Sequence, residues 1–336
     1  MKKILVTLAV LAASAHSALA EPISIKIATI APDGSPWAVA LDDWKKEVEK
    51  GAPGQVKVKI FKGGALGDEA DTVMQVKRGQ IQGVGASTGA VATQVPEVNV
   101  LELPYLFHNY KETDYIIDNV IGSMLSKHFT DRGLMIGFWS ENGFRSFGGK
   151  APVAKMADLR GRKMRSQENP IHISTYRAFG ASPVPIPTTE VLTSLQTGVV
   201  DGFDNTLLFT FAASWHTAIK YFSVSEHIYQ PAVIVFNKGA YDSWPPAIQA
   251  LVMKAGNKIV QPLRDQIRAM EPILLDNLKA SGIAVNEVPA AERAAMMKAA
   301  EAVRSEYVSK ASANEKALYN AITAGLKTYR AKHPGQ

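Results

Sequence analysis

The sequence predicts an α/β protein of two domains, and three of its features carry that prediction. Strand-like and helix-like segments alternate along the first three quarters of the chain, as expected for a parallel sheet with crossover helices. The last quarter is helical in pattern. The chain has 336 residues, which is more than the ~250–300 at which a single core stops growing. No Pro/Ser-rich linker is present, so we expect several strands to cross between the domains.

The beginning of the chain shows the clearest alternation. Apolar and polar residues alternate over 23–27 and again over 56–60, which is the period of a strand. Between them, residues 37–50 place tryptophan and aliphatic side chains on one face of a helix. A second helix is expected over 68–79, with Asp68 as its N-cap and Gly79 at its end. A third strand follows over 81–86.

The alternation continues in shorter segments and then gives way to helices. Further strands are expected over 134–139, 162–165, 184–186, 199–203 and 232–236. Further helices are expected over 113–132, 171–179, 188–198 and 207–219. After Pro245-Pro246 the chain is predicted to be helical almost to its end, with kinks at Pro262 and Pro272.

The first twenty residues have the pattern of a secretory signal peptide. Lys2 and Lys3 precede a mostly apolar run over 4–13, and Ala18-Leu19-Ala20 fits a cleavage site between Ala20 and Glu21. No cysteine follows, so a lipid anchor at the new N-terminus is excluded. No later segment reaches ~18 uninterrupted apolar residues, so we expect a soluble protein outside the cytoplasm.

Composition excludes several classes of function. The chain has no cysteine, which removes disulfides, thiolate catalysis, iron–sulfur clusters and cysteine-based zinc sites. The formal charge is +6 without a block of consecutive Lys or Arg, so a nucleic-acid partner has little support. The histidines show neither i, i+4 pairing nor an H-E-x-x-H motif, so no metal site is expected. Gly83, Gly85 and Gly89 miss the dinucleotide-binding spacing by one residue and no Walker A lysine is present, so no cofactor is expected either.

One sequence motif indicates an enzyme as the alternative to a binding protein. Gly85-Ala86-Ser87-Thr88-Gly89 matches the G-x-S-x-G nucleophile elbow and follows a predicted strand. The elbow also needs a following helix, but Val95-Pro96 comes soon after, and no His-Gly oxyanion segment lies upstream. A secreted serine hydrolase that uses Ser87 is therefore the second hypothesis.

Two arginines and an amide point to an anion-binding site. Arg165 ends a short predicted strand, where open α/β sheets bind ligands and where a guanidinium can grip a carboxylate. Arg145 follows the strand expected over 134–139, and Asn205 follows the strand over 199–203. Aromatic residues for the walls lie nearby in sequence: Trp139, Phe144, Phe203 and Phe209. Arg160 and Arg162 are interpreted as a solvated edge.

Several segments, in order, resemble one family. They are Leu66-Gly67-Asp68-Glu69, Leu103-Pro104-Tyr105, Asn142-Gly143-x-Arg145, Leu159-Arg160-Gly161-x-Lys163-x-Arg165, Gly180-Ala181-Ser182-Pro183-x-Pro185, Glu190-Val191, Leu195-Gln196-Thr197-Gly198 and Val200-Asp201-Gly202-x-x-Asn205. Together they resemble the substrate-binding proteins of tripartite ATP-independent periplasmic (TRAP) transporters. The resemblance runs from Ile25 almost to the C-terminus.

The resemblance implies an architecture and partners. The fold would be periplasmic-binding-protein-like, with two α/β lobes, each around a sheet, a ligand cleft between them and a long C-terminal helix, which residues 248–278 fit. Lobe I would hold residues 21–143 plus about 231–271, and lobe II residues 144–230 plus about 272–336. The protein would be a periplasmic monomer that is not an enzyme. It would deliver a small carboxylate to the small and large membrane subunits of a permease, although a protein of this fold could also serve a sensor.

The resemblance also implies roles for single residues. Arg165 falls on the arginine that forms the salt bridge to the ligand carboxylate, Arg145 on a second supporting arginine, and Asn205 on an amide that contacts the same carboxylate. Three positions would line the pocket and vary with the ligand: Glu69, Ser87 and Thr188. Phe203 and Leu192 depart from the family pattern, which carries a more polar residue at the first and often a Tyr near the second. These departures indicate a ligand less polar than a sugar acid. The ligand itself stays open among dicarboxylates, 2-oxo, hydroxy, aromatic and sugar acids.

Overall fold

The computed structural model describes residues 21–334, so the predicted signal peptide lies outside the described residues. The strands are β1 (Ile23–Thr29), β2 (Val56–Phe61), β3 (Gly83–Ser87), β4 (Leu134–Gly149), β5 (Lys163–Ser166), β6 (Ser182–Pro185), β7 (Gly202–Thr206), β8 (Tyr221–Asn237) and β9 (Ala284–Glu287). They form one mixed sheet in the order β2-β1-β3-β8-β4-β7-β5-β6, and β9 pairs with β8. The pairs β1–β2, β1–β3, β5–β6 and β5–β7 are parallel, as the alternation of elements predicts.

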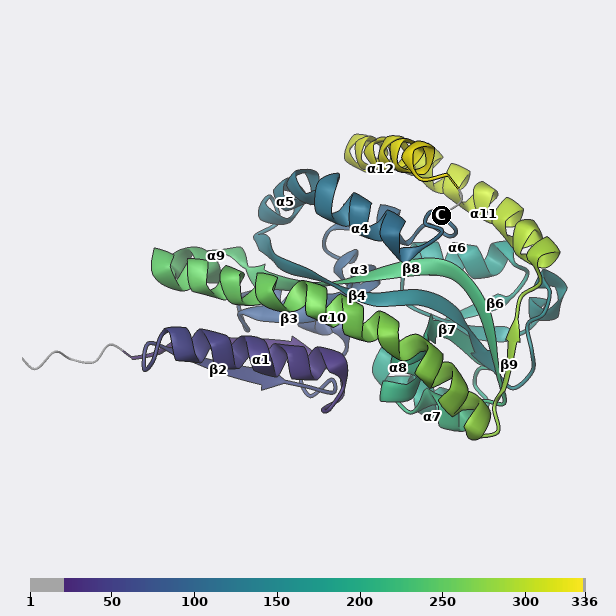
Figure 1. Cartoon of the computed structure of the whole chain (residues 1–336), viewed down its shortest axis with the longest axis horizontal. Helices are drawn as coiled ribbons and strands as arrows, with labels where there is room; N and C mark the ends of the chain where they lie inside the picture. Colours follow the sequence, from purple (N-terminus) through teal and green to yellow (C-terminus); the bar gives the residue numbers. More distant parts are fainter. Residues whose placement is uncertain (1–20, 335–336) are drawn as a thin grey trace, which may run out of the picture.

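Helices cover both faces of this sheet (Figure 1). The α-helices are α1 (Pro36–Gly51), α2 (Glu69–Lys77), α3 (Thr88–Val91), α4 (Tyr110–Asn119), α5 (Gly122–Thr130), α6 (Pro170–Ala178), α7 (Val191–Thr197), α8 (Leu207–Ala212), α9 (Lys238–Ser243), α10 (Pro246–Ala280), α11 (Ala290–Lys310) and α12 (Ala313–Lys332). Short 3-10 helices are η1 (Pro96–Glu102), η2 (Met156–Leu159), η3 (Thr188–Glu190) and η4 (Trp215–Ala218). Within the described range, no helix has the length and apolar character that a membrane crossing requires.

Two long antiparallel strands run through the whole molecule. β4 has 16 residues and β8 has 17, and they join the parallel strands of one end of the sheet to those of the other. Their pairing shifts register between Ile136/Phe138, Glu141/Gly143 and Arg145/Phe147, and such bulges bend strands. The expectation of one sheet per lobe is therefore corrected, because β4 and β8 make the hydrogen-bonded path continuous.

The predicted lobe boundaries fall inside these connecting elements. The positions 143/144 and 230/231 lie within β4 and β8, and 271/272 lies within α10. The sequence indicated only 134–139 and 232–236 as strands here. Polar residues interrupt the alternation in the rest of β4 and β8, because those positions face a polar interior rather than an apolar core. The division into lobes stays a prediction.

The helix expected over 248–278 is confirmed as α10, which has 35 residues and continues through Pro262 and Pro272. In Figure 1 it lies across the strands, beside α1 at one end and α8 at the other. The indole of Trp44 on α1 donates to the carbonyl of Val252, at 3.1 Å. A Cβ at Gly256 would lie 2.2 Å from the ring of Phe138, so this glycine allows α10 to approach β4 closely.

Two predicted helices are broken in the structure. The helix expected over 113–132 is divided into α4 and α5 at residues 120–121. The helix expected over 207–219 ends with α8, and Ser214 then adopts a φ of 59°. The turn places Trp215 between the rings of Phe203 and Phe209, where it is almost fully buried. The free energy gained by burying the indole therefore exceeds the gain from continuing the helix that the periodicity predicted.

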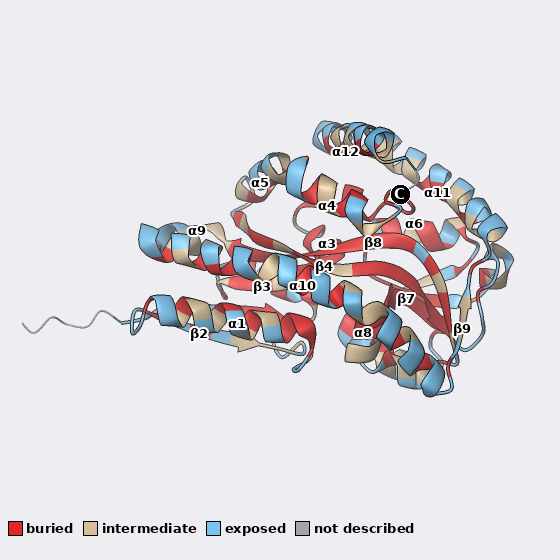
Figure 2. Cartoon of the chain, in the orientation of Figure 1, coloured by how far each residue is buried: buried red, intermediate tan, exposed pale blue. Residues whose placement is uncertain are grey.

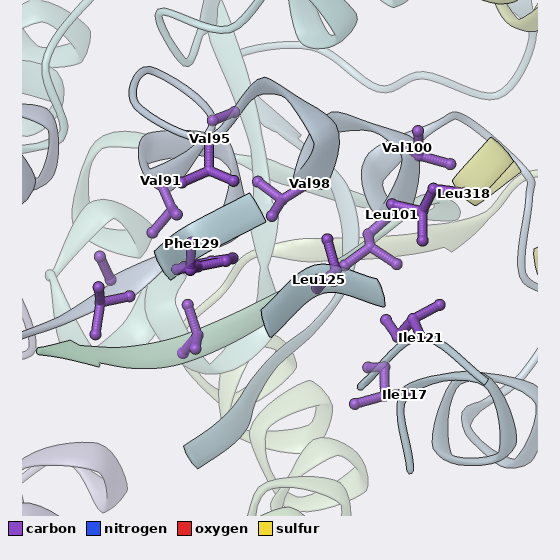
Figure 3. Packing of buried hydrophobic residues seen from close by; sticks show 14 of the residues in the cluster. Val91, Val95, Val98, Val100, Leu101, Ile117, Ile121, Leu125, Phe129 and Leu318 are labelled. Atoms are coloured by element: carbon purple, nitrogen blue, oxygen red, sulfur yellow. The ribbon is translucent and has the colours of Figure 1, made fainter. Parts of the chain in front are cut away.

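The central strands β3, β4, β7 and β8 are buried along most of their length, whereas β6 and β9 are not, and the helices expose one face to solvent (Figure 2). The largest apolar cluster lies under α4, α5 and α12 and includes η1 and the end of α3 (Figure 3). Its core residues include Val98, Leu101, Ile117, Leu125 and Phe129. Separate clusters lie between α1 and the sheet and beside α7 and α8. The sheet is therefore held by packing on both sides, and its strand ends are free to carry polar groups.

Candidate ligand-binding site

A cavity lies where the carboxyl ends of β1, β3, β5 and β7 converge, between α1, α10 and the strands β4 and β8. It encloses about 690 Å³ of empty space, its open mouth included. The carboxyl ends of parallel strands are where open α/β sheets bind ligands. Polar lining residues are Thr29, Glu69, Ser87, Ser140, Asn142, Arg145, Arg165, Gln167, Thr188, Asn205 and Gln230. The remaining lining residues are apolar or glycine: Ile30, Ala31, Trp37, Ala40, Leu41, Gly85, Ala86, Phe138, Phe209, Ala232, Val233, Ile234, Ile259 and Leu263.

The structure brings six of the seven expected site residues to this cavity. Arg165 is the next-to-last residue of β5, Arg145 lies on β4 and Asn205 on β7, while Glu69 begins α2, Ser87 ends β3 and Thr188 begins η3. These elements are far apart in sequence and meet only because both groups of parallel strands point their carboxyl ends at one place.

Arg165 is buried but has no acidic partner. Its side chain is 1% exposed, and its Nε donates to the carbonyl of Ile186 at 2.9 Å. Nη2 donates to Thr188 Oγ1 at 3.1 Å, and the guanidinium lies 5.5 Å from the Trp215 ring centroid. Among the described residues, no carboxylate forms an ion pair with it. Burial and the nearby Arg145 lower the pKa of Arg165 to about 10, so it remains cationic at neutral pH.

Arg145, by contrast, is already neutralised. Its Nε donates to Asp204 Oδ2 at 2.6 Å and its Nη2 to the carbonyl of the same residue. Its Nη1 donates to Gln230 Oε1 at 2.7 Å. Although burial opposes ionisation, the charge of Arg145 holds the pKa of Asp204 well below its usual range. The Tyr176 hydroxyl also donates to Asp204, at 2.8 Å, so this carboxylate is fully held within the protein.

Asn205 presents a free donor to the cavity. Its Oδ1 accepts from Arg145 Nη1 at 3.3 Å and from the backbone N–H of Thr206 at 2.8 Å, which orients the amide. No hydrogen bond from its Nδ2 occurs to any other described residue. An incoming anion can therefore accept from this amide without breaking an existing bond.

Glu69 and Ser87 form a buried pair on the other side of the cavity. Glu69 accepts from the backbone N–H of Ser87 at 2.7 Å and from its hydroxyl at 2.8 Å. Gln167 Nε2 donates to Ser87 Oγ at 2.9 Å. Burial, together with the charge of Asp68, raises the pKa of Glu69 to about 7.

This geometry does not support the serine hydrolase. A helix does follow the motif, since α3 begins at Thr88, but Ser87 has a relaxed φ of −67° rather than a strained one. Its hydroxyl bonds to a carboxylate and an amide, and no described histidine reaches it. The nearby His172 is bound instead to Glu102, at 2.5 Å. A nucleophile elbow needs a histidine base at the serine.

Phe203 is the expected site residue that the structure places elsewhere. It is fully buried, its ring lies 4.9 Å from that of Trp215, and it does not line the cavity. Of the other expected wall residues, Phe209 lines the cavity and Trp139 and Phe144 do not. Phe138 lines it instead, next to a register shift of β4 that alternation alone could not anticipate.

Sequence reasoning missed several lining residues. Gln230 connects the site, since its Oε1 accepts from Arg145 and its Nε2 donates to Gln167 Oε1 at 2.8 Å. Gln167 lies two residues after Arg165, so the alternation of a strand could have placed both on one face. Trp37 and Phe138 gave no such signal, because only the packing of α1 and β4 brings them here. Among the residues described, no cluster of His, Asp or Glu is suited to hold a metal ion.

The chain matches the model of a protein family described as bacterial extracellular solute-binding protein, family 7, over residues 27–311. A solute-binding protein of Verminephrobacter eiseniae is 35% identical over 74% of this chain and 74% of its own length. The C4-dicarboxylate-binding periplasmic protein DctP of Rhodobacter capsulatus is 27% identical over 91% and 93%, respectively.

A TRAP periplasmic solute-binding protein of Xanthobacter autotrophicus, solved with β-D-galacturonate, is 29% identical. It superposes with a TM-score of 0.84 over 89% of this chain and 99% of that one. These relatives are binding proteins rather than enzymes, and the expected periplasmic-binding-protein-like α/β fold with its long helix is confirmed. With the fold, the converging strand ends and these matches in agreement, the chain belongs to the TRAP-type solute-binding proteins of family 7.

Proposed function

We propose that this protein captures a small organic carboxylate in the periplasm and delivers it to the membrane subunits of a TRAP permease. The observation that carries the proposal is the buried, unpaired guanidinium of Arg165 at the cavity wall. A buried charge without a partner costs free energy. A ligand carboxylate removes that cost and accepts two parallel hydrogen bonds from the guanidinium.

The neighbouring donors fit the same ligand. Asn205 Nδ2 is free, and Arg145 adds positive potential although Asp204 balances its charge. Hydrogen bonds to charged groups contribute about 1.5–3 kcal/mol each. Two or three of them therefore supply a large share of the about −8 kcal/mol of a micromolar complex. The similar proteins from Rhodobacter and Xanthobacter, which by name bind a C4-dicarboxylate and β-D-galacturonate, support an acid as the ligand.

Closure around the ligand follows from the lobes predicted by the sequence. Gln167 follows β5 on one side of the cavity and contacts Glu69 and Ser87 on the other. The bulged strands β4 and β8 connect the two sides and are the proposed hinge. A ligand that touches both walls stabilises the closed form, because only a difference in affinity can shift such an equilibrium. The closed monomer would then dock on the permease, after removal of the signal peptide between Ala20 and Glu21.

Calorimetry with small carboxylates and their primary amides tests the proposed function. We expect at least one acid to bind with a micromolar dissociation constant and its amide to bind at least a hundredfold more weakly. An acid at 100 times its dissociation constant should stabilise the protein by about 2.7 kcal/mol, which a thermal shift detects. Equal binding of acid and amide, or no binding across the panel, would contradict the proposal.

Binding should weaken as the pH rises above neutrality, because Glu69 lines the same cavity as the ligand. Burial, with a smaller contribution from the charges of Asp68 and Glu102, raises its pKa to about 7 in the free protein. A bound carboxylate raises that pKa further by like-charge repulsion, so binding takes up a proton above pH 7. The affinity should therefore fall by about three- to fivefold between pH 7 and pH 8.

Two glutamate-to-glutamine variants test whether Glu69 causes this pH dependence of binding. Glu69→Gln should bind with a nearly flat profile over this pH range. Glu271 also has a pKa raised to about 7 by burial but lies outside the cavity lining, so Glu271→Gln should keep the wild-type profile. Calorimetry at pH 6, 7 and 8 measures all three proteins. A wild-type profile in Glu69→Gln would contradict this role.

A further inference from the structure

The cavity has two different walls. Its charged and amide groups come from β4 and β8, from the ends of β5 and β7 and from the start of α2, while α1 and α10 contribute Trp37, Leu41, Ile259 and Leu263. We infer that the ligand is a monocarboxylate with a branched aliphatic or aromatic body, which the wall of α1 and α10 selects. This inference rests on the proposed function and names the class of acid.

The charged side chains of the cavity can neutralise one ligand carboxylate. Arg145 and Arg165 are the only cationic side chains among the described lining residues, and Asp204 already pairs with Arg145. The lining also contains Glu69, which repels a further negative charge when it is ionised. The second carboxylate of a dicarboxylate would thus be buried without a cation, which is unfavourable.

The apolar wall presents little that could receive a hydroxyl group. The indole Nε1 of Trp37 donates to the carbonyl of Glu141 at 2.8 Å, so the one polar atom of that side chain is already used. Phe138 and Ile234 continue this wall from β4 and β8. Their side chains belong to the apolar cluster between α1 and the sheet, so this end of the cavity is continuous with the hydrophobic core.

The polar wall is largely satisfied by its own contacts. Ser87, Gln167 and Gln230 bond to Glu69, Arg145 and to each other. Ser140 Oγ is the one lining hydroxyl that is buried without a hydrogen-bond partner among the described residues. The cavity therefore offers few unused polar groups beside the carboxylate, so the several hydroxyl groups of a sugar acid would lose hydrogen bonds to water that the cavity does not fully replace.

Three six-carbon acids separate the classes by calorimetry. We expect 4-methylpentanoate to bind at least tenfold more tightly than adipate or gluconate, since each buried methylene contributes about fourfold in affinity. Tighter binding of adipate or gluconate would overturn the inference and leave the proposed function standing. If all three acids and 3-phenylpropanoate fail to bind while another carboxylate of the panel binds, the inference alone is overturned; if no carboxylate of the panel binds, both are overturned.

A pair of substitutions on α10 tests the wall itself. Ile259→Thr removes apolar surface at the cavity, and Ile273→Thr makes the same change at a side chain that is 59% exposed and outside the lining. Ile259→Thr should weaken 4-methylpentanoate binding by at least about fourfold and leave gluconate binding no weaker than before. Ile273→Thr should change neither. Equal losses in both variants, or equal losses for both acids, would contradict selection by α10.

Discussion

Replacement of Arg165 by alanine is expected to abolish carboxylate binding and to leave the protein folded. The guanidinium would make two charged hydrogen bonds to the ligand, which together are worth about 3–6 kcal/mol, or about a hundredfold to more than ten-thousandfold in affinity. The free protein should not unfold, because Arg165 has no acidic partner that its loss would orphan. Removal of an uncompensated buried charge also offsets part of the packing that is lost.

The geometry of the side chain matters as well as its charge. Arg165→Lys keeps a cation, but an ammonium cannot present the planar pair of donors or stack on Trp215 in the same way. We expect at least a thirtyfold loss of affinity. Arg160→Ala removes an exposed arginine of the same segment and should bind as the wild type does. Calorimetry with circular dichroism measures binding and folding together. Wild-type affinity in either Arg165 variant would remove this residue from the proposed site.

Asp204→Asn is expected to have the largest effect on stability, a loss of about 3–5 kcal/mol, as for other buried ion pairs that lose one partner. The carboxylate is 1% exposed, pairs with Arg145 and accepts from the Tyr176 hydroxyl. The amide leaves the guanidinium of Arg145 buried without a counter-charge. Because the pKa of Asp204 lies well below its usual 3.8, the stabilisation is present above that value and is lost only in stronger acid.

Chemical denaturation of three variants measures this effect. Asp276→Asn removes a carboxylate whose side chain is 78% exposed, and it should change the free energy of unfolding little. The double variant Asp204→Asn/Arg145→Gln should lose less stability than the sum of the two single variants, since it removes both charges. Additive losses, or an Asp204→Asn protein as stable as the Asp276→Asn protein, would show that the ion pair does not hold this part of the fold.

The local sequence pattern was sufficient to predict most of the helices and strands and the polar residues of the site. The strands β1 and β2 follow from apolar–polar alternation, because buried and exposed side chains alternate along parts of them, and α10 follows from helical periodicity, because it buries one face against the sheet. The positions of Arg165, Arg145 and Asn205 followed from their place after predicted strands and from the family resemblance. Carboxyl ends of parallel strands meet at one edge, so residues that end them meet as well.

Contacts between segments that are distant in sequence determined the remaining features of the site, namely its ion pairs and its apolar wall. Asp204 and Asn205 are adjacent in sequence, yet only the pairing of β7 with β4 makes the first a partner of Arg145 and leaves the second with a free donor. The same packing turns Phe203 into the core and brings α1 and α10 together as an apolar wall. The sequence by itself determined which residues end strands and which carry charge. The tertiary structure decided which charge stays unpaired and which side chains surround it, because burial and ion pairing depend on neighbours that no local period records.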